Sequence, residues 1–253
     1  MGVPHAFTAQ TFTNARDTAL ELEEIGKEIW TYEGSQVDFY GFPFPTRMTL
    51  IRLAGGDLWV HSPENLTDQL QQELATLGTV RYLISPNKLH HLFLEQWMAA
   101  YPDALTYSAP GLAQKRKDIQ FAEELSDYPD RRWSREVEQT IFRGSPSMEE
   151  VVFYHRSSKT LILTDLIENF DPRTLNWWQR GLARLAGTVH PHGKMPLDWR
   201  LTFLLGSKEK ARASLRRIMA WDIQNVVLSH GKCVFGFGDE FVRNSFSWLQ
   251  NHA

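Results

Sequence analysis

The sequence predicts an α/β protein whose sheets are covered by helices. Short apolar strands alternate with stretches of helical period along its 253 residues, an order typical of strands joined by crossover helices. The apolar fraction of 42% is that of a globular protein with a sizeable core. A single cysteine excludes a disulfide framework and the cysteine-rich zinc and iron–sulfur scaffolds. The nine histidines are therefore where we look for chemistry.

The first half of the chain alternates between strand and helix. Residues 54–57 form a turn between two runs of alternating polarity, which predicts a β-hairpin. Beyond Ser62-Pro63 the apolar period becomes four, which predicts a helix that Gly78 ends. The expected strands lie at 28–32, 47–53, 58–61 and 80–84, and the expected helices begin at 62 and at about 89.

The second half begins with a charged stretch at 110–133, where Lys115-Arg116-Lys117 is typical of a solvated helix face. Residues 156–159 form a turn of hairpin length between two apolar strands. Ser207 is expected to cap a basic helix that runs to about Trp221. The expected strands lie at 151–155, 160–164 and 225–228, the other helices at 175–185 and 239–249, and a loop rich in Gly, Pro and His at 187–196.

Three strand-to-loop junctions carry side chains that bind metals. The carboxyl ends of strands are where loops meet on a rigid sheet, and the residues that follow the three strands are His90-His91, Asp165 and His230. Three imidazoles and a carboxylate form a complete donor set for a zinc- or iron-type ion. His61, at another strand end, is expected beside this set. The alternative is that these histidines only form hydrogen bonds and that Asp165 caps a turn.

These junctions resemble the metallo-β-lactamase superfamily, with Ser229-His230-Gly231 after the last strand. Within it, several phrases are similar to the DUF4336 family over about Ile29 to Trp248. They are Arg47-Met48-Thr49, His61-Ser62-Pro63, Pro86-Asn87-Lys88-Leu89-His90-His91 and Thr160-Leu161-Ile162-Leu163-Thr164-Asp165. The resemblance implies a four-layer αββα sandwich, with its metal site at one edge of the two sheets. It also implies a single domain over 1–253, with 1–27 as an N-terminal extension.

The superfamily motif His-x-His-x-Asp-His is altered here. Pro86 and Lys88 stand at its first two histidines, and Ser145 stands where a third ligand of the first metal is expected. The resemblance therefore implies one divalent ion, zinc, iron or manganese, bound by His90, His91, Asp165 and His230. Lys88 is then a candidate catalytic residue, because its ammonium can replace the missing ion's charge and hold an anionic substrate group.

Three functions remain open at this stage. One is a metal-dependent hydrolase-like protein that acts on an ester, lactone or phosphoester. Another is a catalytically inactive scaffold that binds a small ligand or a protein partner, for which Trp177-Trp178 is a candidate surface, although core packing under a long loop is the ordinary expectation. Thiol chemistry at Cys233 is a third reading, set against inert packing of a lone cysteine before Val234-Phe235.

Charge and hydropathy limit the partners. The net charge is only −3, so the basic helix at 208–217 gives no broad cationic field and no nucleic-acid partner is expected. No run approaches the roughly 18 apolar residues of a membrane span, so no membrane partner is expected. Residues 1–10 lack the pattern of a secretory signal. We expect a cytoplasmic protein that binds a small-molecule substrate or ligand.

Overall fold

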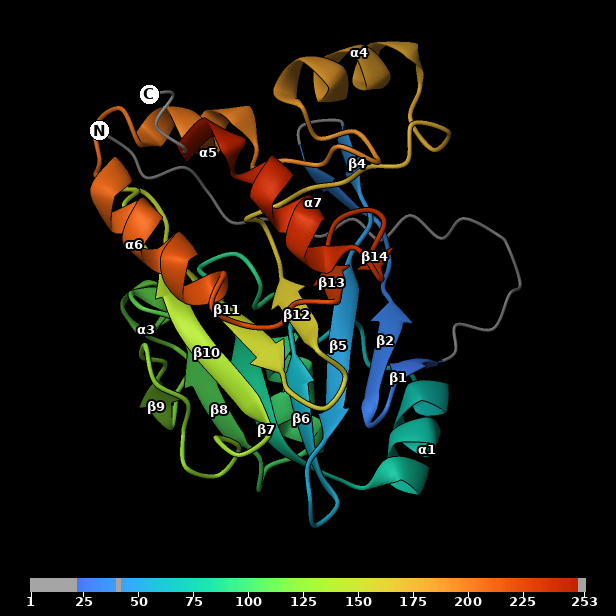
Figure 1. Ribbon diagram of the computed structural model, residues 1–253. Helices are drawn as coiled ribbons and strands as arrows, with labels where there is room; N and C mark the ends of the chain where they lie inside the picture. The colour runs from blue at the N-terminus through green and yellow to red at the C-terminus, as the bar shows by residue number, and fades with distance from the viewer. Residues whose placement is uncertain (1–21, 40–41, 250–253) are drawn as a thin grey trace.

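The computed structural model describes residues 22–39 and 42–249 (Figure 1). Two β-sheets pack face to face and helices cover the outer face of each, which confirms the four-layer αββα sandwich. Most of the expected N-terminal extension, residues 1–21, lies outside the described residues. Its last part contributes strand β1 (Glu23–Gly26), which pairs with the strand predicted at 28–32 and so belongs to the first sheet.

The first sheet has seven strands and changes from antiparallel to parallel pairing across its width. In spatial order these strands are β1, β2 (Ile29–Glu33), β5 (Arg47–Arg52), β6 (Asp57–His61), β7 (Thr79–Ser85), β8 (Leu105–Ser108) and β9 (Glu123–Glu124). Strands β5 and β6 form the predicted hairpin, whereas β6 to β9 run parallel. A separate ribbon of β3 (Val37–Phe39) and β4 (Phe42–Phe44) lies beyond the sheet.

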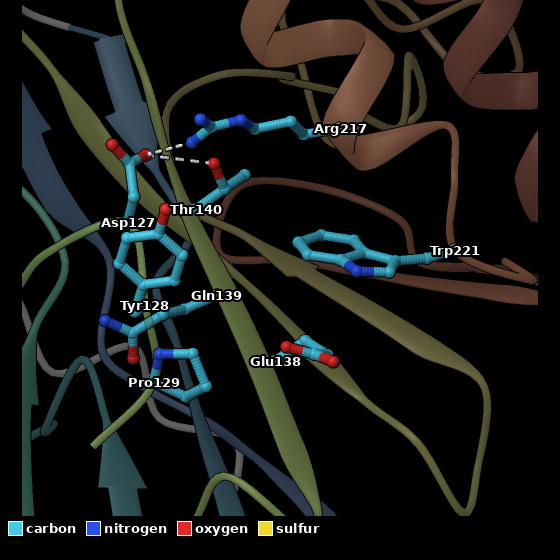
Figure 2. Close-up of a pocket in the computed structure, with 8 residues that line it drawn as sticks. All are labelled: Asp127, Tyr128, Pro129, Glu138, Gln139, Thr140, Arg217 and Trp221. Carbon is cyan, nitrogen blue, oxygen red and sulfur yellow. Dashed lines mark hydrogen bonds and ion pairs between the residues drawn. The ribbon is translucent and has the colours of Figure 1, made fainter. Parts of the chain in front are cut away.

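The second sheet has five strands, and only β12 and β13 pair in parallel. In spatial order they are β10 (Val137–Phe142), β11 (Glu150–His155), β12 (Thr160–Leu163), β13 (Asn225–Leu228) and β14 (Val234–Phe235). Strand β10 is an edge strand, and a surface hollow beside it is lined by Tyr128 and Trp221, among others (Figure 2). Sequence analysis predicted neither β10 nor β8.

Three of the seven helices in the described part of the chain, those at 68–77, 177–186 and 208–218, begin at a side-chain capping hydrogen bond. In chain order the helices are α1 (Asp68–Leu77), α2 (Leu94–Ala100), α3 (Leu112–Lys115), α4 (Trp177–Ala186), α5 (Leu197–Thr202), α6 (Lys208–Ile218) and α7 (Gly238–Ser245), followed by the 3₁₀ turn Ser247–Leu249. Ser207 caps α6 as predicted, because its side chain accepts from the Lys210 amide. Helix α1 starts later than predicted, since Thr67 rather than Ser62 accepts the capping hydrogen bond.

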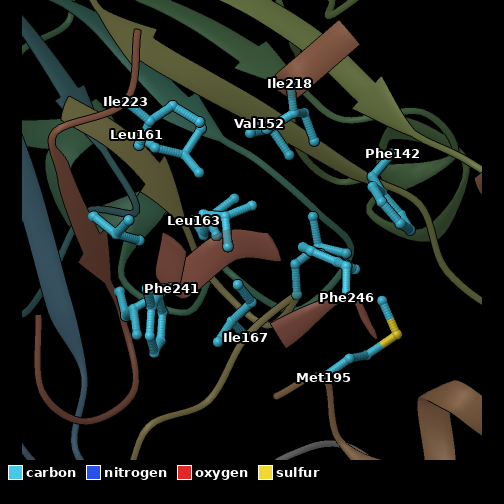
Figure 3. Packing of buried hydrophobic residues seen from close by; sticks show 14 of the residues in the cluster. Phe142, Val152, Leu161, Leu163, Ile167, Met195, Ile218, Ile223, Phe241 and Phe246 are labelled. Atoms are coloured by element: carbon cyan, nitrogen blue, oxygen red, sulfur yellow. The ribbon is translucent and has the colours of Figure 1, made fainter. Parts of the chain in front are cut away.

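Three apolar clusters fill the three gaps between the four layers. Along β5, Met48 and Leu50 face α1 and α2 on the outside, whereas Ile51 faces the second sheet. The alternation along β12 is the same: Leu161 and Leu163 pack under α6 and α7 (Figure 3), and Ile162 points between the sheets. This period of two is what a strand buried on both faces requires.

The carboxyl ends of the parallel strands lie at one edge of the sandwich. The two sheets are joined there, because the Val151 amide donates to the Pro86 carbonyl at 2.8 Å. The residues that follow β6, β7, β12 and β13 therefore meet at this edge. No helix within 22–39 and 42–249 is long and apolar enough to cross a membrane.

Candidate metal centre

Three side chains predicted as ligands converge at this edge. The Nε2 atom of His230 lies 3.0 Å from Oδ1 of Asp165 and 3.3 Å from Nε2 of His90. Nε2 of His90 lies 3.4 Å from Oδ2 of Asp165. One donor atom from each residue falls within 4.8 Å of the others. His90 comes from the turn after β7 in the first sheet, whereas Asp165 and His230 follow β12 and β13 in the second.

Each of the three side chains also contacts a neighbouring polar group that orients it. Nδ1 of His230 lies 2.8 Å from the Pro45 carbonyl oxygen, and Nδ1 of His90 lies 2.6 Å from the Ser62 hydroxyl. The Asn87 amide donates to Oδ2 of Asp165 at 2.6 Å. Such outer contacts fix ring orientation and are typical of metal-binding histidines and carboxylates.

The proton count at His230 requires a hydrogen or a cation in the centre of this group. A carbonyl oxygen only accepts, so Nδ1 of His230 carries the hydrogen that faces Pro45. In the neutral ring the lone pair is then on Nε2, where it points at the Asp165 carboxylate and at a second imidazole nitrogen. Lone pairs in such contact repel one another. Either a further proton or a cation must lie among them.

The spacing fits a metal ion. Two ligand atoms that each lie about 2.0–2.1 Å from one tetrahedral ion are separated by about 3.3 Å. The Nε2 atoms of His90 and His230 are 3.3 Å apart, and they lie 3.4 and 3.0 Å from the two different oxygens of Asp165. Two imidazoles and a carboxylate are also the donor chemistry that zinc, iron and manganese accept. The residues present therefore fit a divalent ion.

Asp165 remains ionised although it is buried. Burial alone raises the pKa of its carboxyl, but the nearby rings of His90 and His230 outweigh this effect and lower that pKa below its ordinary value. A carboxylate that keeps its charge among imidazoles is the form that binds a metal.

Glu150 lies directly behind Asp165 and is fully buried. Its carboxylate accepts from the backbone amides of Thr164 and Asp165, both at 2.8 Å, and from the Asn87 side chain at 3.2 Å. Burial and the Asp165 charge raise the pKa of Glu150. Glu150 and Asn87 together fix the backbone from which Asp165 projects.

His91, which the family resemblance placed among the ligands, lies outside the converging group. Its Nδ1 lies 3.0 Å from the guanidinium of Arg116, and its pKa is lowered to about 4 by burial and by Lys115 and Arg116. The cause is the turn after β7: the Asn87 side-chain oxygen accepts from the amides of Leu89 and His90, so α2 begins only at Leu94. Successive side chains diverge in this turn.

The residues at the altered motif positions offer no donor set for a second ion. Ser145 accepts from the amides of Ser147 and Met148, which engages its hydroxyl in a local turn. Lys88 packs beside Gly111, where an added Cβ would lie 2.6 Å from Lys88 Cε. Within the described residues the Lys88 ammonium forms no ion pair. The Lys115 ammonium donates to the backbone carbonyl of Lys88.

His61 lies between the sheets as an unusual buried polar group. Its ring stacks on Trp59 and meets Phe153 edge-on, and neither ring nitrogen has a hydrogen-bond partner among the described residues. Burial and the charge of His90 lower the pKa of His61 to about 3. It is therefore a neutral ring near His90, as expected, and is not one of the converging donors.

Sequence reasoning missed the supporting residues Asn87, Glu150 and Ser62. The only signal for Glu150 was a carboxylate directly before the apolar run of residues 151–154. Two other expectations are resolved by exposure and charge. Trp177 and Trp178 are exposed, so core packing was the wrong expectation for them. Burial raises the pKa of the Cys233 thiol despite nearby Arg47, which disfavours a thiolate nucleophile.

The fold and this site together define a protein of the metallo-β-lactamase fold. A metallo-β-lactamase from Pontibacter korlensis superposes with a TM-score of 0.61 at 14% identity, over 92% of this chain and 100% of its own. TMB-1, a protein studied for substrate and inhibitor binding, superposes with a TM-score of 0.63 at 16% sequence identity. The match covers 92% of this chain and 99% of TMB-1. The metal-soaked Flv1 flavodiiron core from Synechocystis sp. PCC6803 gives 0.60 at 17%, over 91% of this chain and 60% of that one. These likenesses concern the fold alone.

The chain belongs to the DUF4336 family. The model of this family, described as a domain of unknown function, matches residues 26–181, more than half of the chain. The match includes β5, the turn that carries His90, and Asp165, but it ends before His230. No protein of curated function matches the sequence.

Proposed function

We propose that this protein is a metal-dependent hydrolase-like enzyme with a single divalent ion bound by His90, Asp165 and His230. The observation that supports this best is the separation of about one tetrahedron edge between the two imidazole nitrogens, each of which lies beside one Asp165 oxygen. It is combined with a His230 tautomer that directs the Nε2 lone pair into the group.

Three protein ligands suit catalysis better than the four expected from sequence. Four ligands fill a tetrahedral ion, whereas three leave a position for water or substrate, as in catalytic rather than structural zinc sites. When bound, a divalent ion there would polarise a substrate carbonyl or phosphoryl oxygen and lower the pKa of a bound water. The chain itself would orient the site: Asn87 holds Asp165, Ser62 holds His90, and the Pro45 carbonyl holds His230.

The charges beside the site favour an anionic or ester-type substrate. Lys88 lies two residues before His90 on the turn after β7, and Lys115 and Arg116 lie at the end of α3. Lys88 and Arg116 both contribute to lowering the pKa of Lys115, after burial, which places these cations near one another. Lys88 would hold an anionic group of an ester, lactone or phosphoester as a point charge.

Hydrolysis by the metal-loaded chain tests this proposal. We expect turnover of at least one class among nitrophenyl esters, lactones and phosphodiesters, and a loss of about 100-fold or more in Asp165→Asn. Cys233→Ala, the matched control, should retain full activity because its thiol is buried and protonated. Lys88→Gln should raise KM for anionic substrates while leaving neutral ones unchanged.

The second candidate function is ligand binding without catalysis. It is favoured by the replacement of the first metal's ligands with Pro86, Lys88 and Ser145. Metal-loaded protein that hydrolyses no member of the panel, yet retains a copurifying small molecule that chelation of the metal releases, would replace the enzyme proposal with this one.

A further inference from the structure

Helix α4 presents an apolar face to solvent. Its exposed apolar side chains are Trp177, Trp178, Leu182 and Leu185. Trp177 is 85% exposed and Leu185 is 80% exposed, values usual for charged residues rather than for these types. Because successive helical residues are turned by about 100°, the four fall within an arc of about 140°. The opposite side of the helix carries buried Gln179 and Ala183, which pack toward the body of the protein.

Further exposed apolar side chains lie on α5 and on the turn that follows it. The exposed leucines there are Leu197, Leu201, Leu204 and Leu205, the last of them 89% exposed. Arg200 of α5 donates a hydrogen bond to the Ala186 carbonyl at the end of α4, so the two elements are held together. Both lie at the top of the molecule in Figure 1. We call these eight side chains the α4–α5 face.

This surface is larger than scattered exposed residues would produce. Monomeric proteins rarely expose contiguous apolar patches of many large side chains, and such patches mark docking surfaces for proteins or membranes. Tryptophan on an outward helix face is typical of helices that lie at the boundary between lipid and water.

The charge around the face identifies its occupant. Four of the chain's 27 Lys and Arg residues fall within 172–197, and none of its 30 Asp and Glu residues does. These cations are Arg173, Arg180, Arg184 and Lys194. Arg180 and Arg184 form no ion pair with any described residue, and on the helix they border the apolar arc. Two carboxylates border this stretch, Asp171, which pairs with Arg173, and Asp198 on α5. A protein that is acidic overall therefore has an excess of positive charge around this apolar surface.

We propose that the α4–α5 face docks on an anionic lipid bilayer, with Trp177, Leu182 and Leu185 inserted among the lipids and Arg184 at the headgroups. The arrangement of apolar outer face and cationic flank is that of an interfacial helix. A second copy of the chain fits less well, because two such faces would bring cation against cation. The expectation of no membrane partner rested on the lack of a spanning segment, and a helix that lies on a bilayer needs none.

Sedimentation with lipid vesicles tests this proposal on the full chain. Vesicles of phosphatidylcholine mixed with phosphatidylglycerol should bind the protein, and high salt or pure phosphatidylcholine should weaken the binding. The double variant Trp177→Ser/Leu185→Ser should bind at least about tenfold more weakly, since two large apolar side chains no longer enter the lipid. Arg184→Gln should bind about fivefold more weakly to anionic vesicles only.

A matched control comes from the hollow beside β10. Tyr128 is 75% exposed there, with Asp127 and Arg217 paired close by, and Tyr128→Ser should bind vesicles like the unmodified chain (Figure 2). Three results would overturn the proposal: no sedimentation with anionic vesicles, equal binding by the double variant, or a dimer in light scattering that this variant dissociates. The last result would assign the face to a second copy.

Discussion

At the level of single residues, Asn87 decides which histidine reaches the site. Its side-chain oxygen accepts from the amides of Leu89 and His90, and its side-chain nitrogen donates to Asp165. These bonds hold the turn after β7 open, so that His90 faces Asp165 and His91 faces Arg116.

Substitution of the two adjacent histidines tests this assignment. We expect His90→Ala to lower zinc affinity by at least about 100-fold, because it removes a ligand. His91→Ala should leave the affinity within about threefold of the unmodified chain, since its ring contacts Arg116 instead. Isothermal titration with zinc measures both. An equal loss in the two variants would restore the four-ligand set predicted from sequence.

Buried histidines should make the protein sensitive to acid. His155 is buried in β11, where its ring meets the hydroxyls of Ser157 and Ser158, and burial lowers its pKa to about 4. The unfolded chain binds this proton near pH 6.5, so stability should fall as the pH drops from 6.5 toward 4. Between pH 7 and pH 4 the free energy of unfolding should fall by about 2–3 kcal/mol less in His155→Gln than in the unmodified chain. Urea unfolding at the two pH values measures this difference. An unchanged pH dependence would show that His155 binds its proton at the same pH in the folded and the unfolded chain.

The sequence predicted which strand ends form the site, but not the direction in which individual side chains point. Residues at strand ends give His90, Asp165 and His230, because topology alone brings such ends together. The orientation of His91 depends on hydrogen bonds of Asn87, and the role of Glu150 depends on its contact with the Thr164 and Asp165 amides. Neither contact leaves a local pattern in the sequence.

At the level of elements, the turn between β13 and β14 explains why a glycine follows His230. Gly231 has φ +94°, and a Cβ there would lie 2.2 Å from the Asn169 carbonyl oxygen. The same carbonyl accepts from the Lys232 amide, and the Asn169 amide donates to the His230 carbonyl at 3.1 Å. The turn is thereby tied to the segment after β12, which fixes His230.

Gly231→Ala should destabilise the protein by about 3 kcal/mol or more, because it combines backbone strain with a clash that the neighbouring backbone must relieve. Gly236→Ala is the matched control. Its φ is +82°, yet nothing lies within 4 Å of an added Cβ, so only the conformational cost of about 1–2 kcal/mol should remain. Denaturant unfolding measures both. Equal losses would mean that the contact with Asn169 carries no cost.

Element types were predicted better than their number. The hairpin of β5 and β6 and the Ser207 cap follow from local patterns, and both are confirmed. Strand β10 was missed because Glu138 and Gln139 interrupt its apolar run. Gln139 is nevertheless buried, since it accepts from the Trp133 ring and donates to the Ser126 carbonyl. A partner distant in the sequence thus makes a polar residue compatible with a strand.

At the level of the whole molecule, the candidate site joins the two sheets. His90 belongs to the first sheet, and Asp165 and His230 belong to the second. The sheets also meet beside it, where the Ser229 hydroxyl donates to the Arg47 carbonyl at 3.2 Å. An ion held by all three residues would therefore crosslink the halves of the sandwich.

Metal binding should consequently stabilise the entire fold. At a free metal concentration of 100 times Kd, binding to the folded state alone raises the free energy of unfolding by about 2.7 kcal/mol. For a chain of this size this corresponds to a Tm increase of about 5–10 °C. Asp165→Asn should show no metal-dependent increase in calorimetry. An increase of the same size in this variant would place the ion elsewhere.

The number of ions per chain tests the central claim most directly. The protein would be stripped with chelator, loaded separately with zinc, iron and manganese, and desalted. Its metal content would then be measured by inductively coupled plasma mass spectrometry. The three converging ligands and the altered positions Pro86, Lys88 and Ser145 predict one ion per chain with at least one of these metals. A content near zero with all three metals, or near two with any of them, would contradict the account.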